Sequence, residues 1–244
     1  MMGSRSMPEA VAWTTSGDAK LHLGDVEAAG AHEQRAAWEP YDFNGGTVLA
    51  IAGKDFVVVA GDTRLSTGYS ILSRDESKLH QLTPTTVLGC PGSHNDVIQL
   101  RGVLSIQAQM YQHDNEAEMT TSSMAQLLMN TLYSRRFFPY YAFCILCGID
   151  EEGKGVVYSY DAIGSHDRVT RAAQGSGGHL MIPLLDNLVE HESRSDPKRD
   201  FTLQEVRRSP PLPSELARMV DVIVEILTIT ASGIAREMFA LKKD

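Results

Sequence analysis

The stretch from Gly45 to Arg64, GGTVLAIAGKDFVVVAGDTR, decides the fold of this chain. It contains two short apolar runs, Thr47–Ala52 and 56–60, which are separated by a Gly-Lys-Asp turn at residues 53–55. Apolar runs rich in β-branched residues on either side of such a turn predict a β-hairpin. Because both runs are apolar almost throughout, we expect the two strands to be covered on both faces.

Downstream of this hairpin, blocks of strands are separated from blocks of helices. A strand over 86–90 leads into a helix that starts at Ser93, where Asp96 would complete a capping box. The expected apolar stripe of that helix is Val97, Leu100, Leu104 and Ala108. Further expected elements are helices over 122–133, 175–187 and 213–227, strands over 142–150 and 156–161, and closing segments over 229–231 and 234–241. Such segregated blocks favour a layered α+β sandwich over an alternating βαβ fold.

The composition bounds the class of protein. The chain has 244 residues, of which 43% are hydrophobic and 22% charged, as in an ordinary globular protein with a sizeable core. Its net charge of −9 argues against a nucleic-acid binder, which needs clustered Lys and Arg to neutralise phosphates. Charges or glycines interrupt every apolar run before it reaches membrane-spanning length. Residues 1–40 lack hydrophobic periodicity and are expected to form a flexible, propeptide-like extension, which leaves 41–244 as the folded domain.

Three cysteines, Cys90, Cys144 and Cys147, are an odd and small number that fits a reducing compartment. Cys144 and Cys147 have the spacing of a redox or zinc pair, but they lie within an expected strand. Residues three apart on a strand point to opposite faces, so we expect buried core thiols. The eight histidines show no metal-ligand spacing, so no metal and no cofactor is expected.

Six segments together resemble the proteasome β-subunit family, and within it the beta-6 (type-1) branch: 45–50, 60–64, 77–78, 131–141, 148–155 and 183–187. The Arg-Arg-Phe-Phe-Pro-Tyr-Tyr run at 135–141 is especially specific to that branch. The resemblance covers about residues 41–227 and the C-terminal tail. It implies the fold of the N-terminal-nucleophile hydrolases, a four-layer αββα sandwich in which helices cover two packed antiparallel sheets.

The resemblance also implies where a catalytic site would lie. In active members, an N-terminal Thr attacks the peptide carbonyl with its hydroxyl and uses its own amine as the base, while a Lys, an Asp and a Ser assist. Asp62, Lys78 and Ser176 match those supporting positions. Counting back sixteen positions from Asp62 and thirty-two from Lys78 leads in both cases to Gly46, which has no side chain. We expect no catalytic residue here, only vestigial positions, with Ser176 capping a helix.

Thr47 is the alternative nucleophile, since cleavage after Gly46 would make it N-terminal. That register would place Thr63 and Leu79 where the family has its Asp and Lys. A slip of one residue on a strand also turns the side chain to the other face. These two consequences count against a self-processing threonine protease that uses Thr47.

The C-terminal region is shorter than the family pattern after about residue 227. A turn and a strand have no counterpart, either through a real deletion or through an error in the sequence. A real deletion would cost one sheet a strand and expose an edge. The resemblance implies a non-catalytic β subunit that completes the β ring of the 20S core particle for ATP/ubiquitin-dependent protein degradation. It further implies contacts with β subunits of the same ring, with α-ring subunits and with the opposite β ring, in cytoplasm and nucleus. No nucleic-acid or membrane partner is expected.

Overall fold

The computed structural model describes residues 41–191, 194–195, 202–208 and 223–239. The extension expected over 1–40 lies outside these residues, as does most of the helix expected from Pro213. No helix in the described ranges is long and apolar enough to cross a membrane.

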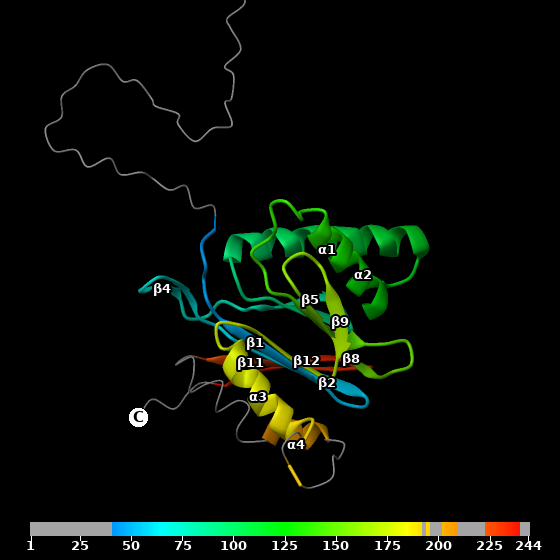
Figure 1. Ribbon diagram of the computed structural model, residues 1–244. Helices are drawn as coiled ribbons and strands as arrows, with labels where there is room; N and C mark the ends of the chain where they lie inside the picture. Colours follow the sequence, from blue (N-terminus) through cyan, green and yellow to red (C-terminus); the bar gives the residue numbers. More distant parts are fainter. Residues whose placement is uncertain (1–40, 192–193, 196–201, 209–222, 240–244) are drawn as a thin grey trace, which may run out of the picture. The chain divides into compact units, whose positions relative to one another are not determined.

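The domain is built of four layers (Figure 1). One outer layer consists of α1 (His94–Asn115) and α2 (Thr121–Tyr133), and the other of α3 (Gly178–Leu188) and α4 (Leu203–Arg208). Between them lie two five-stranded sheets, with the strand orders β5-β6-β7-β8-β9 and β10-β1-β2-β11-β12. A separate two-stranded sheet is formed by β3 (Leu65–Thr67) and β4 (Ser70–Ser73). The predicted α+β sandwich is therefore confirmed.

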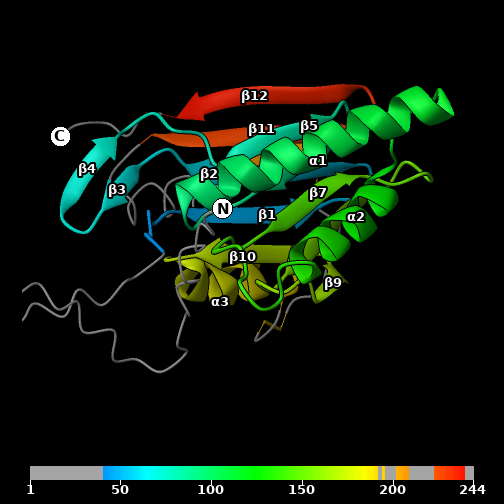
Figure 2. The ribbon, with the colours of Figure 1, turned by 90° about the horizontal axis from the view of Figure 1, so that it is seen from above.

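The two large sheets are antiparallel throughout. The first consists of β5 (Leu79–Thr83), β6 (Thr86–Gly89), β7 (Ile145–Ile149), β8 (Gly155–Tyr160) and β9 (His166–Val169). The second consists of β1 (Thr47–Ala52), β2 (Phe56–Asp62), β10 (Arg171–Gly175), β11 (Val224–Thr230) and β12 (Gly233–Phe239). Figure 2 shows the second sheet running from β12 at one edge to β10 at the other.

Hydrophobic clusters fill the three spaces between the four layers, and the hairpin β1–β2 contributes to two of them. Leu49 and Ile51 lie in the cluster beneath α3 and α4, whereas Val48 and Ala50 lie in the core between the sheets. Strands with both faces buried must be apolar almost throughout, which is why this hairpin could be predicted. The third cluster packs α1 and α2 against β6 and β7 and contains the predicted stripe of Val97, Leu100, Leu104 and Ala108.

The predicted capping box of α1 is wrong. Ser93 occupies the N-cap position, but its side chain makes no capping hydrogen bond. Instead, Asn44 Oδ1 accepts a hydrogen bond from the His94 amide at 2.8 Å. Asp96 Oδ2 accepts from the Tyr141 amide at 2.8 Å, so its carboxylate holds the segment before β7 rather than the first turn of its own helix. Tertiary contacts have replaced the local cap.

Replacing Asn44 with Ala is expected to lower the free energy of unfolding by about 1–2 kcal/mol, the range for loss of an N-cap side chain. Asn44 is buried, and its amide also donates to Thr67 Oγ1 at 3.1 Å. Ser93→Ala is the matched control and should change the stability by less than about 0.5 kcal/mol. Equal losses for the two variants in urea unfolding would contradict this assignment of the cap.

The side chains of Cys144 and Cys147 point to opposite sides of the sheet, as predicted. Cys144 belongs to the cluster beneath α1 and α2, and Cys147 to the core between the sheets. Both thiols are free and fully buried. Within the described ranges, no group of three or more His, Cys, Asp or Glu side chains is placed to hold a metal ion.

The C-terminal region differs from the prediction at the start of β11. Residues 224–227, expected in a helix, belong to β11, because the run VEILTIT is rich in β-branched residues and fits between β2 and β12. Within the described residues the two large sheets have five strands each. The loss of a strand relative to the family pattern stays a prediction. The exposed edge is β12, whose residues are half-buried or exposed.

Candidate functional site

The residue at the centre of the site, Gly46, lies immediately before β1 and has a φ of +93°. L-amino acids with side chains rarely adopt this conformation, whereas glycine adopts it readily. The Gly46 carbonyl accepts hydrogen bonds from the Ser176 amide at 2.9 Å and from Ser176 Oγ at 3.2 Å. The backbone before β1 is therefore tied to the turn that opens α3.

Lys78 occupies the space beside Gly46. A Cβ atom built on Gly46 would lie 2.0 Å from Cε of Lys78 and 2.6 Å from its Cδ. Both separations are far shorter than any van der Waals contact between carbon atoms. The volume that a side chain at position 46 would need is thus already filled by the lysine.

The Lys78 ammonium group forms a buried ion pair with Asp62. Its Nζ lies 3.2 Å from Asp62 Oδ2, and the two side chains are only 8% and 1% exposed. Nζ also donates to the carbonyl oxygens of Asp62 at 3.2 Å and of Arg64 at 2.6 Å. An ammonium group has three N–H donors, so these acceptors use all of them. Burial lowers the pKa of Lys78, although the nearby Asp62 carboxylate acts in the opposite direction.

Asp62 connects this ion pair to the backbone of the neighbouring segments. Its Oδ1 accepts a hydrogen bond from the Thr47 amide at 2.7 Å, and its Oδ2 accepts from the Arg64 amide at 3.3 Å. Both oxygens of the carboxylate therefore have partners, as a buried charge requires. The four predicted positions Gly46, Asp62, Lys78 and Ser176 lie together at one end of β1 and β2.

Ser176 does not cap α3, contrary to the prediction. The N-cap residue is Gly177, and α3 has no side-chain cap. Ser176 instead donates its hydroxyl to the Gly46 carbonyl, since the positive φ of Gly175 (+96°) turns the chain back toward the start of β1. The glycine-rich turn around Ser176 could be recognised in the sequence, but the hydrogen-bond acceptor of the Ser176 hydroxyl could not.

Thr47 points away from the ion pair. Its Oγ1 accepts a hydrogen bond from the Gly177 amide at 2.9 Å, at the start of α3, and the residue is only 2% exposed. This is the face of β1 that carries Leu49, whereas the Lys78 side chain lies beside Gly46 and pairs with Asp62. If Thr47 were the nucleophile, Thr63 and Leu79 would stand at the positions of the supporting Asp and Lys. Neither can assist, because Thr63 Oγ1 donates to backbone carbonyls and Leu79 lies in the core.

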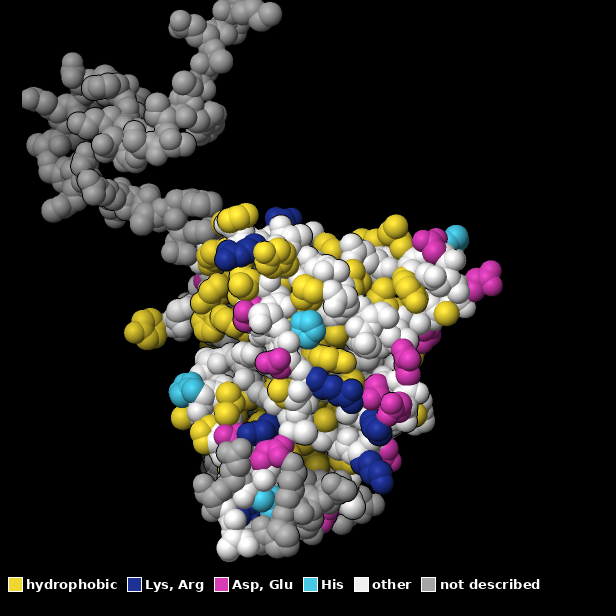
Figure 3. All heavy atoms as spheres, turned by 45° about the vertical axis from the view of Figure 1, so that its right-hand side comes forward, with side chains coloured by type: hydrophobic (Ala, Val, Ile, Leu, Met, Phe, Trp, Pro, Cys, Tyr) yellow, Lys and Arg dark blue, Asp and Glu magenta, His cyan; other side chains and the backbone are white. Residues whose placement is uncertain are grey.

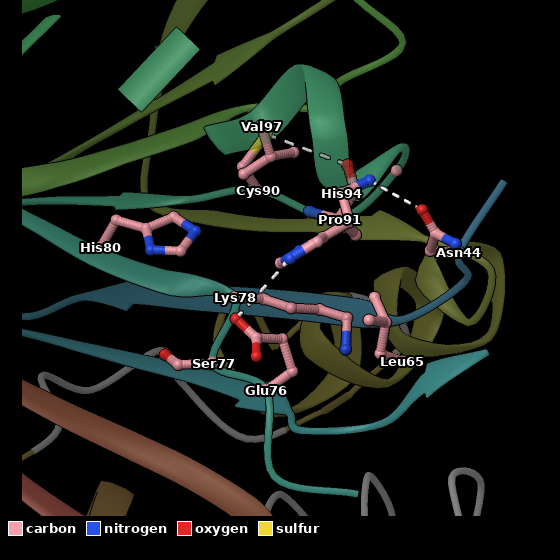
Figure 4. Close-up of a pocket in the computed structure, with 11 residues that line it drawn as sticks. Asn44, Leu65, Glu76, Ser77, Lys78, His80, Cys90, Pro91, His94 and Val97 are labelled. Atoms are coloured by element: carbon pink, nitrogen blue, oxygen red, sulfur yellow. Dashed lines mark hydrogen bonds and ion pairs between the residues drawn. The ribbon is translucent and has the colours of Figure 1, made fainter. Parts of the chain in front are cut away.

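A small cavity of about 20 Å³ adjoins Lys78, and the sequence did not predict it. Its lining includes Asn44, His80, Cys90 and His94, which come from separate parts of the chain (Figure 4). The volume suffices for about one water molecule. Burial, with smaller contributions from Arg101 and His94, lowers the pKa of His80 to about 4. No short motif joins these residues, so no sequence signal could have found the cavity.

Comparisons with known proteins place this chain in a family. The family model for the proteasome subunit matches residues 42–208. Proteasome subunit beta type-1 of Arabidopsis thaliana is 46% identical over 230 residues, covering 87% of this chain and 99% of the relative. Proteasome subunit beta type-1-B of Carassius auratus is 44% identical, covering 91% of this chain and 95% of the relative. The chain therefore belongs to the proteasome subunit family, as a β subunit similar to the beta type-1 members.

Proposed function

We propose that this β subunit of the 20S proteasome core is non-catalytic and that its role is to complete the β ring and the proteolytic chamber. The observation that carries the proposal is the Lys78 side chain, which fills the space beside Gly46. In this arrangement the charged pair has no hydroxyl to activate, and all three N–H groups of Lys78 are engaged.

The surroundings of Thr47 support the same proposal. An N-terminal nucleophile needs a free amine as its base and a hydroxyl that faces the substrate. The Thr47 nitrogen donates to Asp62, and its hydroxyl is engaged by Gly177 on the side of α3. Release of the amine by cleavage would leave the hydroxyl on the wrong face of the strand.

Exposed apolar side chains support assembly with other subunits. Figure 3 shows hydrophobic side chains at the surface in several patches, mixed with charged ones. Among the large hydrophobic residues that the structure describes, the largest exposed fractions belong to Tyr69, Phe137, Leu72, Ile106 and Met110. Exposed apolar side chains that gather in patches are a feature of interfaces. We propose that neighbouring β subunits, α-ring subunits and the opposite β ring cover it, in a particle that degrades ubiquitin-marked proteins in cytoplasm and nucleus.

The proposal is tested with an electrophile that couples to N-terminal threonines. The purified core particle is treated with a peptide epoxyketone, and each subunit is then identified by intact mass. We expect labelled catalytic subunits, which serve as the internal positive control, and no mass increase on this chain. A covalent adduct on Thr47 would overturn the non-catalytic role and favour the self-processing protease. Native mass spectrometry of the same particle reports whether this chain assembles with other β subunits and with α subunits.

A further inference from the structure

Two cysteine thiols face each other just beyond the paired ends of β6 and β7. Gly89 pairs with Ile145 at the ends of these strands, so Cys90 and Cys144 are the next opposed pair. Their Sγ atoms are 3.4 Å apart, and both thiols are free. The ladder continues beyond them, because the Phe143 amide donates to the Pro91 carbonyl at 3.0 Å. The backbone therefore holds the two thiols in register on the same face.

This geometry lies within reach of a disulfide. Directly opposed residues of an antiparallel pair have Cα atoms about 4.5–5.5 Å apart, inside the range of about 4.4–6.8 Å found in disulfides. A disulfide bond is about 2.05 Å long, so the two sulfur atoms need to approach by about 1.4 Å. Side-chain rotation can supply an approach of this size without separating the strands.

A small cavity adjoins one of the two cysteines. Both residues are buried, and Cys90 is one of the residues that line the cavity beside Lys78 and His94 (Figure 4). That cavity of about 20 Å³ has room for a molecule of the size of water, and hydrogen peroxide is only slightly larger. A peroxide in this cavity would lie beside Cys90, whereas Cys144 does not line the cavity.

We propose that Cys90 and Cys144 form a peroxide-sensitive dithiol site that closes into a disulfide. The Cys90 thiolate attacks one oxygen of hydrogen peroxide, the O–O bond breaks, and a sulfenic acid forms while hydroxide leaves and becomes water. The Cys144 thiol then loses its proton and attacks the Cys90 sulfur, the S–O bond breaks, and a second water leaves. Two thiols are oxidised, and one peroxide is reduced to two waters.

The environment makes this a slow reaction that requires sustained peroxide. The hydrogen bond with Cys144, followed by burial, raises the pKa of Cys90 well above the usual range for a thiol. Since the thiolate is the reactive form, its low population limits the first step. The inference rests on the opposed thiols and the cavity, and it is independent of whether the chain is catalytic.

Cys147 is a built-in control for the proposal. It is buried on the opposite side of the sheet, in the core between the sheets, where burial alone raises its pKa. Neither other cysteine shares that face, so Cys147 has no thiol with which to pair. Oxidation of the folded chain should therefore select one of the three combinations of cysteines.

The test uses the full-length chain in its purified complex. The complex is treated with hydrogen peroxide, quenched, denatured in iodoacetamide and digested, and the peptides are analysed by mass spectrometry. We expect a cross-linked pair containing Cys90 and Cys144, about 2 Da lighter than the two reduced peptides together, with Cys147 alkylated. Treatment with dithiothreitol before alkylation should remove the cross-link. In Cys144→Ala the cross-link should be lost, whereas Cys147→Ala should keep it.

Two results would overturn the proposal. The first is alkylation of both Cys90 and Cys144 in the peroxide-treated wild-type complex to the same extent as in the untreated complex. The second is a cross-link to Cys147 in equal yield, which would mean that oxidation follows unfolding rather than the geometry of β6 and β7. Both results are read on the wild-type chain and do not depend on the folding of a variant.

Discussion

Gly46→Thr is expected to produce no proteolytic activity, even though it places a hydroxyl at the position that the family resemblance predicts for the nucleophile of active relatives. The new side chain would have to adopt a φ of +93° and to share its space with Lys78, whose Cε would lie 2.0 Å from the added Cβ atom. The left-handed conformation costs about 1–2 kcal/mol and overpacking about 1–3 kcal/mol. We therefore expect a loss of about 2–5 kcal/mol in the free energy of unfolding.

A control variant separates these two costs. Gly153 also has a positive φ, +78°, but a Cβ atom built on it meets no atom within 4 Å. Gly153→Ala should therefore cost only about 1–2 kcal/mol for the backbone conformation, and Gly46→Ala clearly more. Urea unfolding of the full-length variants measures both. Equal losses of unfolding free energy for Gly153→Ala and Gly46→Ala would show that Lys78 moves aside readily. Epoxyketone labelling of Gly46→Thr, after removal of the preceding residues, would show the same.

Asp62→Asn is expected to be the most destabilising conservative substitution at the site, with a loss of about 3–5 kcal/mol in the free energy of unfolding. It leaves the Lys78 ammonium buried with no counter-charge, and removal of one partner from a buried ion pair has effects of this size. The double variant Asp62→Asn/Lys78→Met should recover much of the loss, because the unpaired charge is then absent. Chemical unfolding of the two single variants and the double variant measures this coupling.

The dependence on pH provides a second readout for Asp62→Asn. Burial lowers the pKa of Lys78 below its unfolded value, so between the two values the unfolded chain binds more protons than the folded one. Stability from this group therefore rises as the pH rises through that window toward 10.5. Loss of the Asp62 carboxylate lowers the folded pKa further, so the rise should begin at lower pH and be larger. Parallel stability curves for wild type and Asp62→Asn, together with a loss below about 1 kcal/mol, would contradict a charged pair.

These two predictions describe one network. Lys78 fills the space beside Gly46, Asp62 neutralises Lys78, and Asp62 also binds the Thr47 amide. Residues that resemble a catalytic apparatus thus join β1, β2 and the segment before β5. We interpret the pair as a structural connection, because both side chains are buried and every donor of Lys78 has an acceptor.

Several features of the fold could be predicted because they depend on contacts close in sequence or on strong patterns. The hairpin β1–β2 follows from two apolar runs around a glycine-containing turn, and the buried face of α1 follows from Val97, Leu100 and Leu104. The predicted helix caps were wrong where a group distant in sequence took the hydrogen bond instead. Asp96 binds the Tyr141 amide instead of its own helix, and Ser176 binds the Gly46 carbonyl. Residues 224–227 continue the apolar pattern of a helix, but they form part of β11, which pairs with β2.

For the site, the sequence by itself determined that glycine stands at position 46, and it predicted from the family resemblance that Asp62, Lys78 and Ser176 match the supporting positions. Identity and spacing are properties of the chain alone. Only the tertiary structure decided that Lys78 fills the space of the missing side chain, that Thr47 faces α3, and that Cys90 opposes Cys144. Each of these depends on which face of a strand a side chain occupies and on how strands distant in sequence are aligned, and that alignment is set by packing across the whole sandwich.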